Sequence, residues 1–356
     1  MLGYGVRRGF SLIELLVVIG ILALLIALLL PALQESRSVA RKVDCQSRLR
    51  QMGLALLLYH DTENMFPLST SLPPLVTADD DYYGEHKMFL RDYACYGWAT
   101  RLLPYFEQTA LFNELDIGNR TLEELIHDRP DLHPLVERRL EVFRCPVDLQ
   151  DDTTISVPLP GTRAALDDGV EVYGGSSSYV GNCGLYDQIW PRGLHPIDRS
   201  NGLFFNGSCT RLTDITDGAS QTIAVGERAW FQGGATWVGS PDLHGEWGKG
   251  SQFIFGNVFY RINAIPDPPG VLITPRDSLT ITGRWSSRNG FSSYHPGGAY
   301  FLFADGSVQF LNENIESRVT IEQTVGPQPP IPDPELMGTF QRLGIRNDGL
   351  PVSGVF

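Results

Sequence analysis

A long apolar run near the start is the dominant pattern along the chain. Residues 15–30 read LLVVIGILALLIALLL and contain no charged or polar side chain. With residues 10–14 in front, the run spans about 31 Å as an α-helix, which matches a bilayer hydrocarbon thickness of about 30 Å. The pattern therefore predicts a transmembrane helix over residues 10–30.

The helical pattern continues past the apolar run to about residue 60. Pro31 is the last proline of this stretch, and Gly53 is the only helix breaker after it. Apolar side chains recur every three or four residues and share one face, namely Cys45, Leu49, Met52, Leu56 and Tyr59. We expect this face to dock residues 31–60, as a spine, against a globular head.

Residues 61–323 have the composition of such a head, rich in glycine, proline, serine and aromatic residues. Helical periodicity returns over residues 102–115 and 122–143, where prolines interrupt the second stretch. Short apolar runs predict strands, at residues 222–226, 252–255 and 271–273. The predicted fold class is α+β, with a long N-terminal helix packed on an antiparallel β-rich head. The proline-rich segment 324–356 is expected to form an extended arm over the head.

A β-hairpin over residues 300–311 is the clearest local structure in the head. Its two apolar strands flank Asp305 and Gly306, and a two-residue Asp-Gly turn suits the type I′ geometry. That turn places Phe301 opposite Phe310. Because both faces of the hairpin are largely apolar, we expect it to lie centrally in a sheet and to be covered on both sides.

Charge indicates how the apolar helix is oriented. Arg7 and Arg8 are the only charges in the leader, residues 1–9, so the positive-inside rule keeps the leader in the cytoplasm and places the head outside it. Over the whole chain, 28 Lys and Arg against 41 Asp and Glu leave a net charge of -13. A negative surface repels phosphate backbones, so we expect no nucleic-acid partner.

The string GFSLIE of residues 9–14 closely resembles the prepilin processing motif of type IV pilins and type II secretion pseudopilins. The resemblance implies cleavage after Gly9 by a prepilin peptidase, N-methylation of the new N-terminal Phe10, and a role of Glu14 in assembly with other pilin-like subunits. Pro31 matches the proline that often kinks these helices. The resemblance also implies a pilin-like fold and a single-pass protein of the bacterial inner membrane, with its head in the periplasm or at the cell surface.

A charged Glu14 side chain in an apolar helix needs a partner of opposite charge. An ionised carboxylate in the apolar run costs up to about 3 kcal/mol, and the amine created at Phe10 is equally unfavourable in lipid. Staggered helices would let the Glu14 carboxylate of one subunit neutralise the Phe10 amine of another copy or relative. Two plainer readings stay open at this point, a secretory signal peptide cut near Ser38-Val39-Ala40 and a simple membrane anchor.

His295 precedes Asp305-Gly306 at the spacing of the His-x9-Asp-Gly motif, which resembles that of a large bacterial family of unknown function whose members also begin with a prepilin-type segment. Further blocks similar to that family lie at residues 45–61, 97–108, 143–146, 178–181 and 215–227. Five cysteines outside the cytoplasm allow at most two disulfides, in fifteen arrangements. We prefer Cys45 with Cys145, because both lie in family-like blocks and their bond would tie the spine to the head.

These observations favour a structural pilin-like or pseudopilin-like subunit of a type IV pilus-like or type II secretion-like apparatus, with no enzymatic activity and no cofactor. One alternative is an anchored binding protein that holds glycans or envelope polymers on exposed aromatics, Trp190, Trp230, Trp237 and Trp247. The other is a metal-dependent enzyme that joins four polar residues, His295, Asp305, Glu227 and His244.

No sequence motif indicates a metal site. The chain has no His-Glu-x-x-His and no Cys-x-x-Cys, and we assign no metal ligands. Acidic clusters at residues 79–81, 148–152 and 167–168 lack the ligand spacing of an EF-hand, which leaves calcium as an open alternative only. Asp305 has a sufficient role in the turn, and continuation of the hairpin would bring His295 across from Glu316.

Overall fold

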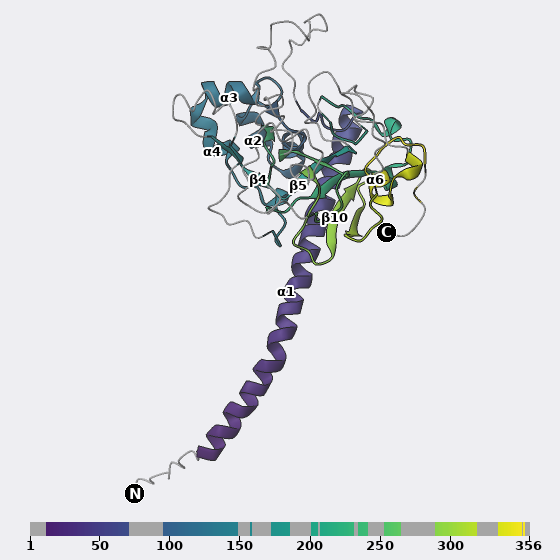
Figure 1. Ribbon diagram of the computed structural model, residues 1–356. Helices are drawn as coiled ribbons and strands as arrows, with labels where there is room; N and C mark the ends of the chain where they lie inside the picture. Colours follow the sequence, from purple (N-terminus) through teal and green to yellow (C-terminus); the bar gives the residue numbers. More distant parts are fainter. Residues whose placement is uncertain are drawn as a thin grey trace, which may run out of the picture. The chain divides into compact units, whose positions relative to one another are not determined.

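The computed structural model describes most of the chain and divides it into two compact units, Met1–Asp44 and Cys45–Phe356. The described residues are 12–70, 95–148, 157–158, 172–185, 201–205, 207–230, 234–240, 253–264, 289–318, 334–350 and 352. Helix α1, Leu12–Glu63, begins in the first unit and ends in the second (Figure 1). Gly9, Phe10, His244 and the predicted strand at residues 271–273 lie outside the described residues.

The first unit contains the apolar part of α1. Glu14 lies in the first turn, and Pro31 lies inside the helix without ending it. The large apolar side chains of this part are exposed, for example Leu24 at 62% and Leu28 at 67%. The helix is long and apolar enough to cross a membrane, in agreement with the prediction for residues 10–30.

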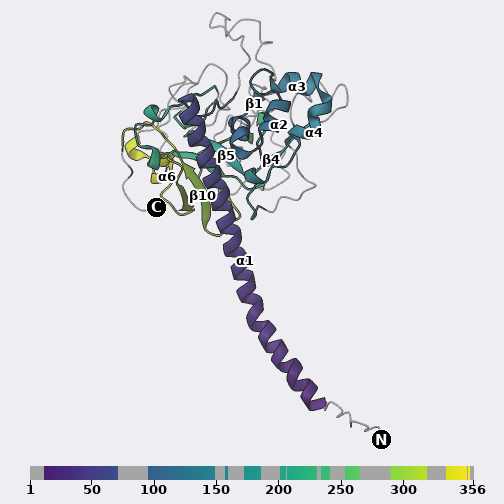
Figure 2. The ribbon, with the colours of Figure 1, turned by 180° about the vertical axis from the view of Figure 1, so that it is seen from behind.

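The second unit begins where α1 becomes buried on one face. Cys45, Leu49 and Met52 are fully buried, Leu56 is 2% exposed, and Tyr59 packs at the edge of the same core cluster. This confirms the predicted face. Leu54 and Leu58, on the opposite side of the same helix, remain exposed. Figure 2 shows this part of α1 beside strands β5 and β10.

A mixed five-stranded sheet organises the second unit, in the order β11-β10-β6-β5-β9. Its strands are β5 (Tyr179–Gly184), β6 (Ile223–Glu227), β9 (Phe255–Asn257), β10 (Gly298–Phe303) and β11 (Val308–Asn312). All neighbours are antiparallel except β5 and β9, which are parallel. The described residues also form three two-stranded sheets. These pair β1 (Cys95–Tyr96) with β8 (Gly239–Ser240), β2 (Val157–Pro158) with β3 (Tyr173–Gly174), and β4 (Ser176–Ser177) with β7 (Ala235–Thr236).

Alternation along β10 separates two core clusters. Leu302 and Ala304 point into the cluster that contains the buried face of α1, whereas Phe301 and Phe303 point into a second cluster. Because successive side chains of a strand face opposite sides, the sheet carries apolar packing on both faces. The chain is therefore an α+β fold, as predicted, with the sheet between the spine helix and a C-terminal layer.

Short helices cover the first cluster where the sequence predicted helical periodicity. They are η1 (Trp98–Phe106), α2 (Thr109–Glu114), α3 (Leu122–Asp128), η2 (Pro130–Leu132), α4 (His133–Val136) and η3 (Glu141–Phe143). Helix α3 begins at a capping box, in which Thr121 Oγ1 accepts from Glu124 N and the Glu124 carboxylate accepts from Thr121 N. Pro130 and Pro134 divide the second predicted stretch, because neither can continue a helix from the preceding turn.

The hairpin of β10 and β11 forms, but its register differs by one residue from the prediction. Tyr300 lies opposite Phe310, and Phe301 lies opposite Gln309. The expectation of a central hairpin covered on both sides holds only for β10. Strand β11 lies at the edge of the sheet, and most of its side chains are partly exposed.

The connection between the two strands explains the shift. Phe303 N donates to Ser307 O at 2.9 Å, and Gly306 N donates to Phe303 O at 3.0 Å. Gly306 takes a left-handed φ of 84°, whereas Asp305 does not. This is a three-residue connection that contains a left-handed glycine, instead of the two-residue type I′ turn. The additional residue in the connection shifts every pair of opposed residues in β10 and β11 by one position.

The C-terminal segment corrects a second prediction. Instead of an extended arm, its described part forms η11 (Pro334–Leu336) and helix α6 (Thr339–Leu343). Phe340 and Leu343 are fully buried in the second core cluster, which Ile345 and Val352 also join. These apolar side chains favour burial over an exposed arm, so the globular unit extends past residue 323.

Candidate functional site

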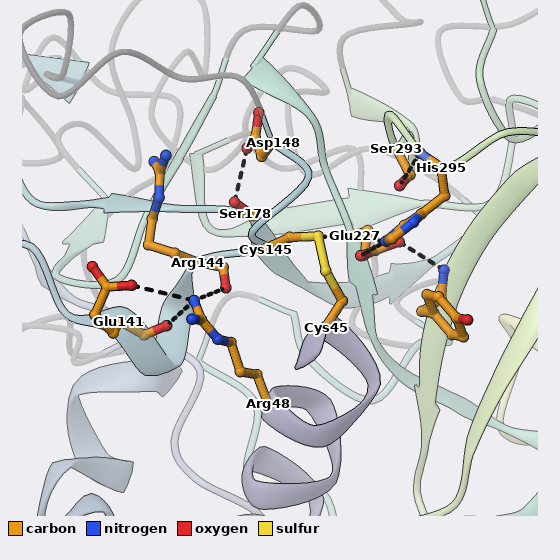
Figure 3. The surroundings of a disulfide bond; sticks show 11 residues. Cys45, Arg48, Glu141, Arg144, Cys145, Asp148, Ser178, Glu227, Ser293 and His295 are labelled. Carbon is orange, nitrogen blue, oxygen red and sulfur yellow. Dashed lines mark hydrogen bonds and ion pairs between the residues drawn. A yellow bond between two sulfur atoms is a disulfide. The ribbon is translucent and has the colours of Figure 1, made fainter. Parts of the chain in front are cut away.

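Four chemically reactive side chains from distant parts of the chain meet in the core of the second unit (Figure 3). Cys45 comes from α1, Cys145 follows η3, Glu227 ends β6 and His295 precedes β10. Their ligand atoms all lie within 4.8 Å of one another. The residues are 0%, 5%, 2% and 2% exposed, respectively. We call this group the Cys-His-Glu cluster.

The two cysteines of the cluster form a disulfide. Cys45 and Cys145 have a Cα–Cα distance of 5.1 Å and are 100 residues apart in the sequence. This is the pairing preferred above among the fifteen arrangements. The bond covalently joins the first buried residue of the spine to the segment after η3.

His295 lies between the disulfide and the carboxylate. Its Nε2 is 3.4 Å from Cys145 Sγ and 3.2 Å from Glu227 Oε1. The other carboxylate oxygen, Glu227 Oε2, accepts a hydrogen bond from Tyr300 N at 2.8 Å. His295 N donates to Ser293 Oγ at 3.0 Å, and the Tyr300 ring meets the imidazole edge-on. The strand β10 and the loop before it therefore hold both side chains.

The carboxylate partner of His295 is Glu227, and the predicted pairing with Glu316 is wrong. Glu313 N donates to Gly297 O, where the hairpin ends, and Gly297 takes a left-handed φ of 84°. The chain before Gly297 thus leaves the ladder with β11. Glu316 lies elsewhere, where its carboxylate accepts from Thr339 Oγ1 at 3.2 Å.

Charged groups around the disulfide bind to backbone and hydroxyl oxygens. Arg48, on α1 one turn after Cys45, donates to Glu141 O at 2.7 Å and to Arg144 O at 2.6 Å. Arg144 in turn donates to Ser176 Oγ at 2.8 Å. The bonds from Arg48 attach the segment that carries Cys145 to the spine (Figure 3). The bond from Arg144 attaches the same segment to strand β4.

Burial controls the electrostatics near the cluster. Asp148 accepts from Ser178 Oγ at 2.8 Å, and desolvation raises the pKa of its carboxyl above the ordinary range. Burial also raises the pKa of the Tyr179 hydroxyl and lowers the pKa of the Arg144 guanidinium. All three shifts disfavour the charged form, as a low-dielectric interior requires.

The structure separates the two halves of the His-x9-Asp-Gly motif. Asp305 Oδ1 accepts from Ser307 N at 2.9 Å inside the hairpin turn, whereas His295 is in the Cys-His-Glu cluster. Of the enzyme constellation predicted above, only His295 and Glu227 come together among the described residues. Asp305 belongs to the turn.

The turn approaches the spine closely. A Cβ added to Gly53 would lie 3.1 Å from Gly306 Cα and 2.7 Å from Leu302 Cδ1. A Cβ added to Gly306 would lie 2.9 Å from Leu57 Cδ1. Gly53 is therefore present because the hairpin turn occupies the space of a side chain, and the Asp-Gly half of the motif serves to dock β10 on α1.

Gly53→Ala should destabilise the protein, although the same change stabilises an ordinary helix by up to about 1 kcal/mol. The new methyl group overlaps the turn, and overpacking costs about 1–3 kcal/mol, so we expect a net loss of up to about 2 kcal/mol. Denaturant unfolding of the full chain measures the change. Gly20→Ala in the same helix is the matched control, because nothing lies within 4 Å of that position. Equal or higher stability of the Gly53 variant would contradict the close approach.

The aromatic binding surface predicted as an alternative is not supported by its described members. Trp237 is fully buried, and its Nε1 donates to Arg138 O at 2.9 Å. Trp230 is partly buried. Trp190 and Trp247 lie outside the described residues, as do residues 79–81, 151–152 and 167–168 of the acidic clusters. Trp237 is thus a core residue and no platform for a sugar ring.

Sequence reasoning named each member of the Cys-His-Glu cluster but did not bring the four together. Metal-binding motifs place ligands a few residues apart, whereas successive members of this cluster are 68 to 100 residues apart along the chain. One signal was available, since all four belong to separate blocks or motifs of the same family resemblance.

Two family models match the chain. One, described as "Protein of unknown function (DUF1559)", matches residues 34–318 and so includes all four members of the cluster. The other, described as "Prokaryotic N-terminal methylation motif", matches residues 6–30. No curated protein and no solved structure matches the chain.

Proposed function

The chain belongs to the DUF1559 family of proteins of unknown function, and from this premise we propose that it is a structural, pilin-like subunit of a type IV pilus-like or type II secretion-like apparatus. Its N-terminal methylation motif is that of a type IV pilin-like or pseudopilin precursor. That motif, followed directly by the exposed apolar part of α1, is the observation that carries the proposal.

The proposal includes processing after Gly9. A prepilin peptidase on the cytoplasmic side removes the leader, and the new N-terminal Phe10 is methylated. Glu14, in the first turn of α1, then lies four residues from a cationic amine. In a lipid environment each charge needs a counterpart, and a neighbouring pilin-like subunit, identical or related, supplies one.

The proposed cellular location of the protein rests on the same N-terminal segment. The apolar part of α1 spans the bacterial inner membrane once, and Arg7 and Arg8 hold the leader in the cytoplasm. The second unit is then extracytoplasmic, in the periplasm or at the cell surface. A structural disulfide suits such an oxidising compartment.

A structural role suits the chemistry of the head better than catalysis does. Glu227 and His295 could act as an acid and a base, but each is only 2% exposed. Catalysis requires contact between such groups and a substrate. The described packing closes over the pair, and Tyr300 N already occupies one carboxylate oxygen.

Mass spectrometry of the mature N-terminus tests the processing step. In cells with an active prepilin peptidase we expect the full-length chain to be recovered with N-methylated Phe10 as its first residue, and in cells without the enzyme we expect the leader to be retained. A mature chain that starts at Met1 or Arg41 in peptidase-positive cells would reject the proposal.

Assembly is tested separately with Glu14→Ala. Loss of a pairing that is worth about 3 kcal/mol should reduce incorporation into filaments by about 100-fold, while membrane insertion and folding of the head are unchanged. Glu35→Ala is the matched control, since Glu35 is an exposed acid on the same helix beyond the apolar run. If both variants assemble like the wild type, a simple tethered protein is the better account.

A further inference from the structure

The Cys-His-Glu cluster has the composition of a zinc site. Two thiolates, one imidazole and one carboxylate are common zinc ligands, and four of them complete the tetrahedral shell of a structural site. We propose that Cys45, Cys145, Glu227 and His295 bind one Zn²⁺ when the two cysteines are reduced. This inference does not depend on the proposed assembly function.

The distances within the cluster fit this ligand shell. With Zn–S near 2.3 Å and Zn–N and Zn–O near 2.0–2.1 Å, a tetrahedral site has S···N edges of about 3.5 Å and N···O edges of about 3.3 Å. The observed values are 3.4 Å from His295 Nε2 to Cys145 Sγ and 3.2 Å from the same nitrogen to Glu227 Oε1. The two sulfur atoms must separate, from bonding distance to about 3.8 Å, and all ligand atoms already lie within 4.8 Å of one another.

One buried oxygen of the cluster has no hydrogen-bond donor among the described residues. Glu227 Oε1 is inaccessible to solvent, and its contact with His295 Nε2 lacks hydrogen-bond geometry. The second oxygen of the same carboxylate is held by Tyr300 N. A metal ligand is typically oriented in this way, with one oxygen bonded to the protein and the other directed at the ion.

The disulfide and the metal site are alternative states of the same two cysteines. The chain is synthesised with two thiols, which lose two protons when they coordinate Zn²⁺ as thiolates. Oxidation by an external disulfide transfers two electrons to that oxidant, forms the Cys45–Cys145 bond and leaves only two ligands, so the metal is released. Each state links α1 to the segment after η3, and the metal adds β6 and the loop before β10.

Metal titration of the full-length chain in detergent micelles tests the proposal. The disulfide is reduced with a phosphine, which becomes its phosphine oxide, and Zn²⁺ or Co²⁺ is then added without oxygen. We expect one equivalent of tightly held Zn²⁺ in the reduced chain and less than a tenth of an equivalent in the oxidised chain. Co²⁺ should give thiolate charge-transfer bands and the visible bands of a tetrahedral complex.

Substitution of the proposed ligands tests which residues bind the Zn²⁺ ion. His295→Gln and Glu227→Gln should each weaken Zn²⁺ binding at least about tenfold. His127→Gln is the matched control, because His127 forms a comparable pair with Glu123, at 2.9 Å, on the surface. Cys45→Ser removes one of the two proposed thiolate ligands, retains Cys145 with Cys95, Cys183 and Cys209, and measures the binding that remains without the complete set of four ligands.

The Zn²⁺ titration of the wild-type chain tests the proposed site even if a variant fails to fold. Circular dichroism accompanies each measurement, and zinc is expected to raise the melting temperature of the reduced wild-type chain. The proposal is overturned if the reduced wild type takes up no more Zn²⁺ than the Cys45→Ser variant, or if the Co²⁺ complex lacks thiolate bands. Equal zinc affinity of folded His295→Gln and wild type would also overturn it.

Discussion

Loss of the disulfide is expected to lower the free energy of unfolding by about 4–5 kcal/mol. The bond between Cys45 and Cys145 closes a loop of 100 residues, and the loop entropy that it removes from the unfolded chain is worth about 4.7 kcal/mol at that length. Cys145→Ser should therefore shift the denaturant midpoint strongly or prevent folding. Equilibrium unfolding of the full chain, with a metal chelator present, measures the change.

Cys209→Ser is the control for this prediction. Cys209 is exposed and lies outside the core clusters, so its replacement should change stability by less than about 0.5 kcal/mol. A Cys145→Ser variant within about 1 kcal/mol of the wild type would mean that noncovalent packing of α1 alone fixes the spine to the head.

Glu227→Ala is expected to destabilise the oxidised protein by about 3–5 kcal/mol. The change leaves the buried His295 imidazole without the carboxylate that lies 3.2 Å from its Nε2. It also removes the acceptor of Tyr300 N, at the end of the ladder between β6 and β10. Thermal and denaturant unfolding of the disulfide-bonded chain measure the loss.

Two variants separate the charge from the hydrogen bond. Glu227→Gln retains an oxygen for Tyr300 N and should cost clearly less than Glu227→Ala. Glu123→Ala removes the carboxylate of the surface pair with His127 and should cost no more than about 1 kcal/mol. If Glu227→Ala is as mild as Glu123→Ala, the buried pair does not support the fold.

Local patterns in the sequence predicted the spine and the helical cover correctly. The face of Cys45, Leu49 and Met52 could be read from spacing alone, because a helix of known period has only one way to group these residues. The long apolar helix needed only length and polarity. Both features depend only on residues that are close together in the sequence, so both can be predicted from it.

Features set by a single turn or by distant packing could not be read in the same way. Asp305-Gly306 permits a two-residue or a three-residue hairpin connection, and the folded chain has the three-residue one, with Gly306 close to Gly53 of the spine. The prolines of the C-terminal segment suggested an arm, but Phe340 is buried in the second core cluster, which forms only when the sheet has folded.

The candidate site could not be predicted either, because it also depends on packing between distant parts of the chain. Cys45 and Cys145 could be paired through the family resemblance, but the partner of His295 depends on which strand lies beside β10. The sequence favours the neighbour along the chain, β11, which carries Glu316 beyond its end. The actual partner, Glu227, comes from β6, the neighbour on the other side.

The position of Cys45 has a mechanical consequence. Tension applied to the N-terminal helix enters the second compact unit at this residue, which is the first of that unit. The covalent path then crosses to Cys145, so the chain between the two cysteines, which are 100 positions apart, bears no load. Fully drawn out, a peptide of that length would extend by about 350 Å. Under tension on α1, this part of the head would therefore not be stretched for as long as the crosslink stays oxidised.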